Sequence, residues 1–220
     1  GVKYGVAVNS CTTGLALSLM AAGIKPGDQV IVPDVTFAAT ANAVKLAGAE
    51  VVLVDVESDR LTISIDEVEA ATNPKTKAVI AVEFNGRCPD YLKLQAYCEQ
   101  NHLALICDSS HGLGSKYLDR PLGSYGIANC FSFSAHKMFF AGQGGAIVTN
   151  DNEIHRNLRN LRDQGRQTSG PQDDILHSVI GFNFKYPNLL AAIGLAQLKE
   201  IKSRVQQANQ RHKWYRELLR

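Results

Sequence analysis

The sequence lacks several features that would assign it to a particular class of protein. Its apolar runs, such as residues 78–82, have the length of a β-strand and are far too short to cross a membrane. The formal net charge is only +2, so neither nucleic acid nor a membrane surface is indicated as a partner. No basic segment followed by an apolar segment opens the chain, so no secretory signal is predicted.

Cysteines at metal-binding spacing are also missing. The five cysteines form no CxxC pair and no cluster with histidine. Their odd number and scattered positions are typical of reduced thiols, so we expect a cytoplasmic protein without a metal site. The motifs GxGxxG and GxxxxGK[ST] do not occur either, and dinucleotide and nucleoside-triphosphate sites of those types therefore lose support.

The sequence does contain an alternation of short apolar runs with helical segments. The runs are continuously apolar, which favours strands buried on both faces; they are 30–32, 51–54, 78–82, 103–107, 130–133 and 146–148. Helices are predicted over 13–22, after the capping-box residue Ser64, and over 91–101. This order predicts an α/β domain with a mainly parallel sheet.

Two segments near the end of the chain differ from this alternation. Residues 163–174 are mostly polar with two glycines and a proline, and a surface loop is predicted there. After Pro187, apolar residues recur at helical spacing from Leu195 to Ala208, which predicts one long helix over about 188–220. Its lysines and arginines would lie mostly on the opposite, solvated face.

Small polar residues, among them Thr12 and Thr13, stand between the apolar residues 6–8 and the first predicted helix. The N-terminus of a helix offers unpaired N–H groups and the positive end of the helix dipole, which suit a phosphate. Two threonine hydroxyls would add further donors. A threonine that only caps the helix explains the same pattern, so both interpretations stand at this point.

A carboxylate and a lysine each follow a predicted strand. Asp108 lies where ligands gather in open α/β sheets, and it could keep a pyridinium nitrogen protonated. His111 could hydrogen-bond a ring oxygen. Lys137 precedes the glycine-rich residues 142–145, and desolvation there would lower its pKa, as covalent catalysis by an amine requires. A loop carboxylate, a structural histidine and a surface lysine are the alternatives.

Together these segments resemble the DegT/DnrJ/EryC1/StrS family of sugar aminotransferases, which are pyridoxal phosphate (PLP) enzymes of fold type I. The resemblance includes residues 9–13, 26–33, 36–43, 108–111, 131–137, 142–150, 181–184 and 191–198, in the family's order. It implies an α/β three-layer sandwich with a mainly parallel sheet, the large PLP-binding domain, over residues 1–220. The family's small C-terminal domain is expected to be absent, and the helix at about 188–220 to lead toward it.

The resemblance implies catalytic roles for Lys137 and Asp108 and a cofactor-binding role for His111. Lys137 matches the Schiff-base lysine, and Asp108 matches the residue that contacts the ring nitrogen. His111 matches a position near the phenolic oxygen of the ring. With PLP as cofactor, the implied reaction transfers an amino group from an amino acid, glutamate, to a nucleotide-linked keto-deoxysugar.

The resemblance also implies contacts to the cofactor. Thr12, Thr13 and Ser132 match residues that bind its phosphate, and Phe37 matches an aromatic side chain that stacks on its ring. Asn183 matches an asparagine that reaches the phosphate bound by the other subunit. A homodimer with a shared active site is therefore expected, with small-molecule substrates and no nucleic acid or membrane partner.

The glycine-and-loop pattern between Gly165 and Gly181 is most similar to perosamine-synthetase-like members, which favours amination at C4. Gln143 departs from the family, where glutamate is common. Two other functions remain open. One is PLP- or PMP-dependent sugar dehydration, in which relatives carry histidine at the position of Lys137; here His136 only precedes the lysine. The other is a non-catalytic binding or regulatory protein, although Lys137 and Asp108 are both retained.

Overall fold

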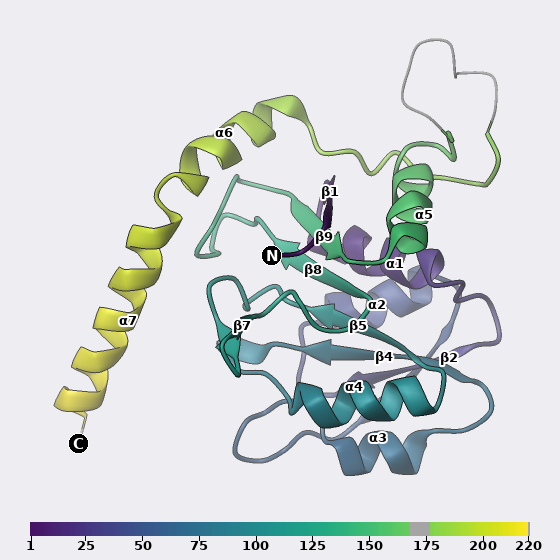
Figure 1. Cartoon of the computed structure of the whole chain (residues 1–220), viewed down its shortest axis with the longest axis horizontal. Helices are drawn as coiled ribbons and strands as arrows, with labels where there is room; N and C mark the ends of the chain where they lie inside the picture. Colours follow the sequence, from purple (N-terminus) through teal and green to yellow (C-terminus); the bar gives the residue numbers. More distant parts are fainter. Residues whose placement is uncertain (168–176, 220) are drawn as a thin grey trace.

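A computed structural model describes residues 1–167 and 177–219. Its centre is a seven-stranded sheet in the order β1-β9-β8-β5-β4-β2-β3 (Figure 1). The strands are β1 (Tyr4–Val8), β2 (Gln29–Pro33), β3 (Glu50–Val54), β4 (Thr76–Val82), β5 (Ala104–Asp108), β8 (Ala128–Ser132) and β9 (Gly145–Thr149). Only β9 runs antiparallel to its neighbours in this sheet, while a separate hairpin holds β6 (Lys116–Tyr117) and β7 (Arg120–Pro121).

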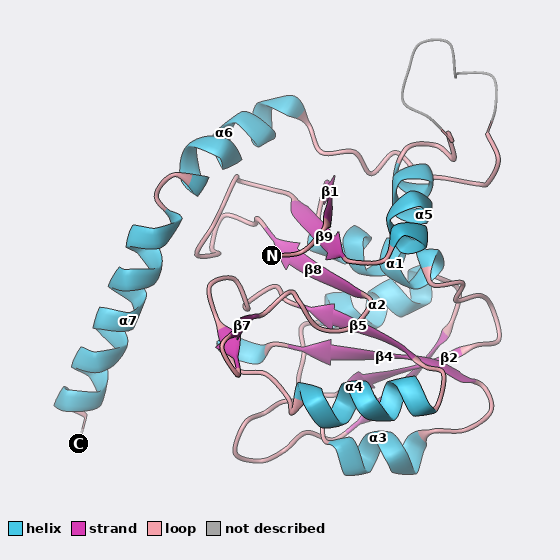
Figure 2. Ribbon diagram, in the orientation of Figure 1, coloured by secondary structure: helices cyan, strands magenta, loops and turns pink. Residues whose placement is uncertain are grey.

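Helices cover both faces of the sheet (Figure 2). The helices α1 (Cys11–Ala21), α2 (Ala38–Leu46) and α5 (Asn152–Arg162) pack on one face, and α3 (Ile65–Ala71) and α4 (Tyr91–Gln100) on the other. Val30 and Val32 enter the first core and Ile31 enters the second. Burial on both faces is the reason that the strands are continuously apolar in sequence. The predicted three-layer α/β sandwich with a mainly parallel sheet is confirmed.

The helices begin where the sequence offers caps. Ser10 Oγ accepts a hydrogen bond from the Thr13 N–H at 3.1 Å, and Ser64 Oγ accepts one from the Glu67 N–H at 3.5 Å. Such side-chain acceptors satisfy N–H groups that have no partner in the first helical turn. The predicted helices at 13–22 and 91–101 are present, with their ends shifted by one or two residues.

The single long helix predicted over about 188–220 is wrong. The structure has α6 (Asn188–Leu198) and α7 (Ile201–Leu218), separated at Lys199 and Glu200. The Glu200 N–H bonds to the Gln197 carbonyl, three residues back, so the chain tightens before α7 begins. The short 3-10 helix η1 (Phe84–Gly86) is also present. Within the predicted loop 163–174, residues 168–174 lie outside the described residues.

The carboxyl ends of several strands meet at one edge of the sheet. Val82, the last residue of β4, pairs with Asp108, the last residue of β5. At the start of β9, Gly145 pairs with both Ser132 and Val8, which end β8 and β1. The segments that follow these strands are therefore neighbours in space. Among the described helices, none is long and apolar enough to span a membrane.

Asp151 caps α5, so its replacement should weaken the packing of this helix against the sheet. Its Oδ1 accepts hydrogen bonds from the N–H groups of Glu153 and Ile154 at 2.7 and 2.9 Å. Asp151→Ala is expected to lower the free energy of unfolding by about 1 kcal/mol, measured by urea denaturation. Asp151→Asn keeps an acceptor oxygen and should lose much less. Equal losses in the two variants would contradict the capping role.

Candidate active site

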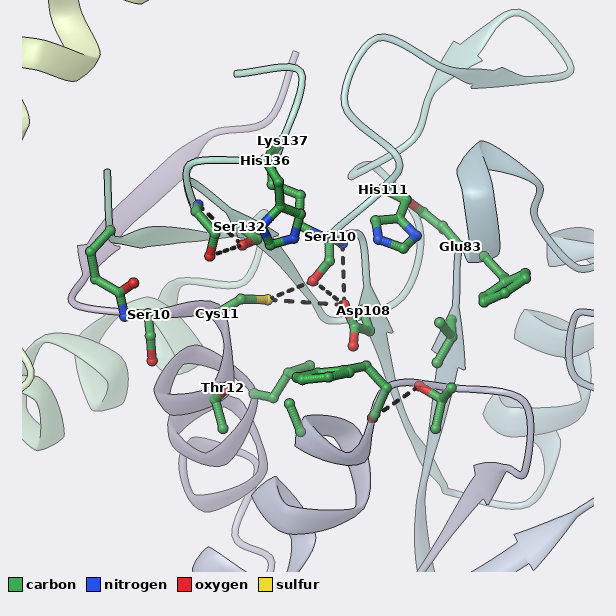
Figure 3. A pocket seen from close by; sticks show the side chains of 18 residues that line it. Ser10, Cys11, Thr12, Glu83, Asp108, Ser110, His111, Ser132, His136 and Lys137 are labelled. Carbon is green, nitrogen blue, oxygen red and sulfur yellow. Dashed lines mark hydrogen bonds between the residues drawn. The ribbon is translucent and has the colours of Figure 1, made fainter. Parts of the chain in front are cut away.

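A cavity of about 440 Å³ lies at the carboxyl edge of the sheet (Figure 3). Its wall is formed by the start of α1, the segment before α2, the ends of β4, β5 and β8, and the segment that precedes β9. Six of the residues that the sequence singles out line it together: Thr12, Phe37, Asp108, His111, Ser132 and Lys137. Segments more than 100 residues apart in the sequence thus form one site.

Thr13 and Asn183 do not line this cavity. The Thr13 hydroxyl donates to Asn9 Oδ1 at 2.6 Å, and its N–H is bonded to the Ser10 hydroxyl, so this residue takes part in the cap of α1. Asn183 is exposed and pairs with Asp163 in an isolated β-bridge. Their assignment to phosphate binding stays a prediction.

Asp108 is a buried carboxylate with a defined set of donors. Ser110 bonds to its Oδ1 through both the hydroxyl, at 2.6 Å, and the backbone N–H, at 3.2 Å. The Thr40 hydroxyl bonds to its Oδ2 at 2.9 Å. Only 6% of Asp108 is exposed, so these bonds replace most of its contact with water. The site therefore holds a fixed acceptor for a positively charged or N–H group.

Lys137 and Cys11 share the cavity with Asp108. Desolvation lowers the pKa of the Lys137 amine below its usual value of 10.5, although Asp108 and Cys11 act in the opposite direction. Burial, and then the neighbouring Asp108, raise the pKa of the Cys11 thiol well above 9.0. Burial thus shifts both groups toward their uncharged forms, the free amine and the thiol.

His111 is held in one tautomer by the main chain. Its Nδ1 accepts a hydrogen bond from the Asn85 N–H at 3.2 Å, so the neutral ring carries its proton on Nε2. Asn85 adopts a left-handed backbone conformation, with φ of 53°, in the turn after β4. Desolvation and the nearby Lys137 ammonium lower the pKa of His111. The neutral imidazole can therefore act as a donor at Nε2.

Sequence reasoning missed Glu83, the residue that directly follows β4. Asp108 has a comparable position at the end of β5. Glu83 is fully buried, lines the cavity, and accepts a hydrogen bond from the Tyr91 hydroxyl at 2.9 Å. Burial raises its pKa from 4.5 to about 7, and the Asp108 charge adds to this effect. Its carboxyl group lies against Gly112, where a Cβ would be 1.6 Å from Glu83 Oε2. The position directly after a buried strand was the signal that could have identified it.

Sequence comparisons show which known proteins this chain is similar to. A model of the DegT/DnrJ/EryC1/StrS aminotransferase family matches residues 1–220. A GDP-perosamine synthase of Caulobacter vibrioides is 36% identical over 219 residues, which are 100% of this chain and 58% of the relative. The chain therefore spans little more than half the length of this relative.

Solved structures show the same fold at similar coverage. DesI, solved in the presence of its TDP-sugar product, has a TM-score of 0.89 and 34% identity, over 99% of this chain and 54% of DesI. NtdA from Bacillus subtilis, solved with bound cofactor PMP, has a TM-score of 0.84 and 31% identity. That match covers 91% of this chain and 45% of NtdA.

The buried Glu83 should make stability depend on pH. Its pKa is about 7 in the folded chain against 4.5 for an unperturbed glutamate, so between these values the folded state retains a proton that the unfolded state has lost. Stability from this group therefore falls as pH rises from about 4.5 to about 7 and is constant above that range. The two values correspond to a loss of about 3 kcal/mol.

Urea unfolding of the native chain and of Glu83→Gln between pH 4.5 and 8 measures this effect. The free energy of unfolding of the native chain, relative to Glu83→Gln, is expected to fall by about 3 kcal/mol over this range. Glu69→Gln, at an exposed position of α3, is the matched control for removal of a glutamate charge. A difference between the native chain and Glu83→Gln that does not change with pH would disprove the assignment.

Proposed function

This chain belongs to the DegT/DnrJ/EryC1/StrS aminotransferase family, and we propose that it is the cofactor-binding domain of a PLP-dependent sugar aminotransferase. The observation that carries the proposal is the meeting of Lys137, Asp108 and the N-terminus of α1 in one cavity. An amine of lowered pKa, a fixed carboxylate and a helix N-terminus suit the aldehyde, the ring nitrogen and the phosphate of PLP respectively.

The cavity walls fit the rest of the cofactor. The hydroxyls of Thr12 and Ser132 would bind phosphate oxygens together with the N–H groups at the start of α1. The exposed ring of Phe37 would cover one face of the pyridine ring, because two flat apolar faces bury well against each other. The Nε2–H of His111 would donate to the phenolic oxygen.

The residues divide the chemistry of amino transfer between them. PLP supplies an aromatic ring that takes up the electrons released when a proton leaves the Cα of the amino donor. Asp108 would hold the proton on the ring nitrogen, which strengthens this effect. Lys137 would bind the cofactor covalently through Nζ and, once displaced by the donor, would remove the Cα proton as a general base. Its lowered pKa increases the share of free amine at neutral pH.

We propose glutamate as the amino donor and a nucleotide-linked keto-deoxysugar as the acceptor, aminated at C4. Similarity to a GDP-perosamine synthase and the Gly165–Gly181 sequence pattern support this choice. Sugar dehydration is disfavoured because a lysine is present at position 137, and a purely binding function because Lys137 and Asp108 share one cavity. The free cysteines of the described chain agree with a cytoplasmic location.

A homodimer is proposed as the working unit. Phe37 is 80% exposed in the single chain, and α6 consists almost entirely of apolar residues although Gly194 alone is buried in this helix. Exposed apolar surface of this kind marks a protein interface. The resemblance supports a second copy as the partner, with Asn183 of each subunit directed to the phosphate of the other.

Lys137 should be the point of covalent attachment. Incubation of the chain with PLP, followed by borohydride reduction and peptide mass analysis, is expected to place a pyridoxyl group on Lys137 Nζ. Lys137→Ala should lose the label and the visible absorbance of the bound cofactor. His136→Ala, one residue away, should keep both. A label on another lysine of the native chain would refute the proposed site.

Asn183 should link cofactor binding to dimerisation. Asn183→Ala is expected to weaken PLP binding about tenfold, as loss of a hydrogen bond to a charged phosphate does. Because PLP bound at the interface also stabilises the dimer, the midpoint concentration for dissociation should rise when PLP is removed. Analytical ultracentrifugation with and without PLP measures this. A monomer that binds PLP with full affinity would contradict both the dimer and the role of Asn183.

A further inference from the structure

Each oxygen of the Asp108 carboxylate is reached by a short chain of donors from a different element. Thr40 Oγ1, in the first turn of α2, donates to Oδ2 at 2.9 Å, and Thr36 Oγ1 lies 2.7 Å from Thr40 Oγ1. A hydroxyl has one proton, so Thr40 donates to the carboxylate and Thr36 must donate to Thr40. Successive bonds in such a chain strengthen one another.

The second chain of donors reaches Oδ1 through Ser110 and Cys11 (Figure 3). The Ser110 hydroxyl donates to Oδ1 at 2.6 Å, and Cys11 Sγ lies 3.1 Å from that hydroxyl. Since the Ser110 proton goes to the carboxylate, Ser110 can only accept from the Cys11 thiol, which also has the Cys130 carbonyl within reach at 3.4 Å. The Ser110 N–H bonds to the same Oδ1 at 3.2 Å. The plane of the carboxylate is thus set from both ends.

The two oxygens differ in how many of their acceptor positions are used. A carboxylate oxygen accepts about two strong hydrogen bonds. Oδ1 already accepts two hydrogen bonds from Ser110, and Cys11 Sγ lies 3.9 Å from the same oxygen. The one hydrogen bond to Oδ2 comes from Thr40, among the described residues. Oδ2 therefore has the free acceptor position.

The Thr36–Thr40 chain also involves the residue proposed to cover the pyridine ring. Phe37 directly follows Thr36 and is the N-cap of α2, and its carbonyl accepts the Thr40 N–H at 3.0 Å. The side chain of Phe37 is 80% exposed, so few contacts of its own hold it in place. The hydroxyl chain instead joins its backbone to Asp108, which comes from another layer of the fold.

From this geometry we propose that Thr40 and Ser110 are positioning residues that orient Asp108 so that Oδ2 accepts a hydrogen bond from the protonated ring nitrogen of the cofactor. Thr40 at the same time places Phe37 relative to that carboxylate. This inference rests on the proposed function, because it concerns bound PLP. It goes further because it makes the protonation state of the ring nitrogen depend on the hydroxyls of Thr40 and Ser110, which need not touch the cofactor.

The test uses the full chain loaded with PLP labelled with ¹⁵N in the ring. The ¹⁵N chemical shift reports whether the ring nitrogen is protonated, and absorbance titration gives the PLP affinity. Thr40→Val, which keeps the shape but removes the hydroxyl, is expected to move the shift toward the unprotonated value and to weaken PLP binding about 10- to 100-fold. Ser110→Ala should act in the same direction. Thr36→Val should have a smaller effect.

Two controls separate positioning from a structural role. Thr40→Ser restores the hydroxyl and should restore the ¹⁵N shift. Thr149→Val removes another buried hydroxyl, which bonds to the Ile127 carbonyl at 2.6 Å away from the site, and should lower the melting temperature without changing the ¹⁵N shift. If Thr40→Val does not fold, Ser110→Ala, at a half-buried position, decides the question alone.

The outcomes distinguish this inference from the proposed function. If the native chain binds no PLP, or binds it without a protonated ring nitrogen, the proposed role of Asp108 fails first. If the native chain shows the protonated ring, but Thr40→Val and Ser110→Ala keep its ¹⁵N shift and PLP affinity, the positioning role is overturned. A Thr40→Ser variant as impaired as Thr40→Val would also overturn it, because the hydroxyl would then not matter.

Discussion

The shared direction of β4, β5 and β8 is the constraint on which the rest of the site depends. Parallel strands in register end together, so residues that follow them in sequence become neighbours even when long crossovers separate them. Asp108 and Ser132 reach the cavity in this way. The antiparallel β9 returns at the same edge and brings the segment after Lys137 back into the sheet. The strands that carry the side chains at this edge are buried in the hydrophobic cores on both faces of the sheet, which fixes the position of these side chains.

Burial at this edge of the sheet shifts the pKa values of bases and of acids in opposite directions. It disfavours the charged form of each group, so it lowers the pKa of Lys137 and raises those of Glu83 and Cys11. Asp108 is buried at the same edge, and three hydrogen bonds from Ser110 and Thr40 replace its contacts with water. The cavity thus combines an amine and two acids that are shifted toward their uncharged forms with one carboxylate that is hydrogen-bonded on both oxygens. No group of three potential metal ligands occurs among the described residues.

Much of this arrangement could be predicted from the sequence. The strands were predictable because burial on both faces leaves a continuous apolar run, and Asp108 and Lys137 because polar residues after such runs stand out. Thr40 could not be predicted in this way, because it lies within a helical segment and its hydrogen-bond partner, Asp108, is 68 residues away in the sequence. The break between α6 and α7, after Leu198, could not be predicted from the sequence either. Apolar residues keep helical spacing across it, and the i→i−3 bond that closes α6 depends on backbone geometry.

The contact between Glu83 and Gly112 has a consequence for the evolution of this site. A side chain at position 112 would occupy the space that the Glu83 carboxyl fills, so the carboxyl would have to move, and its hydrogen bond from Tyr91 with it. A substitution at one of the two positions therefore changes the packing at the other. A lineage that acquires a larger residue at 112 must displace or shorten the side chain at 83. Until then, the buried acid beside Asp108 is inherited together with its glycine.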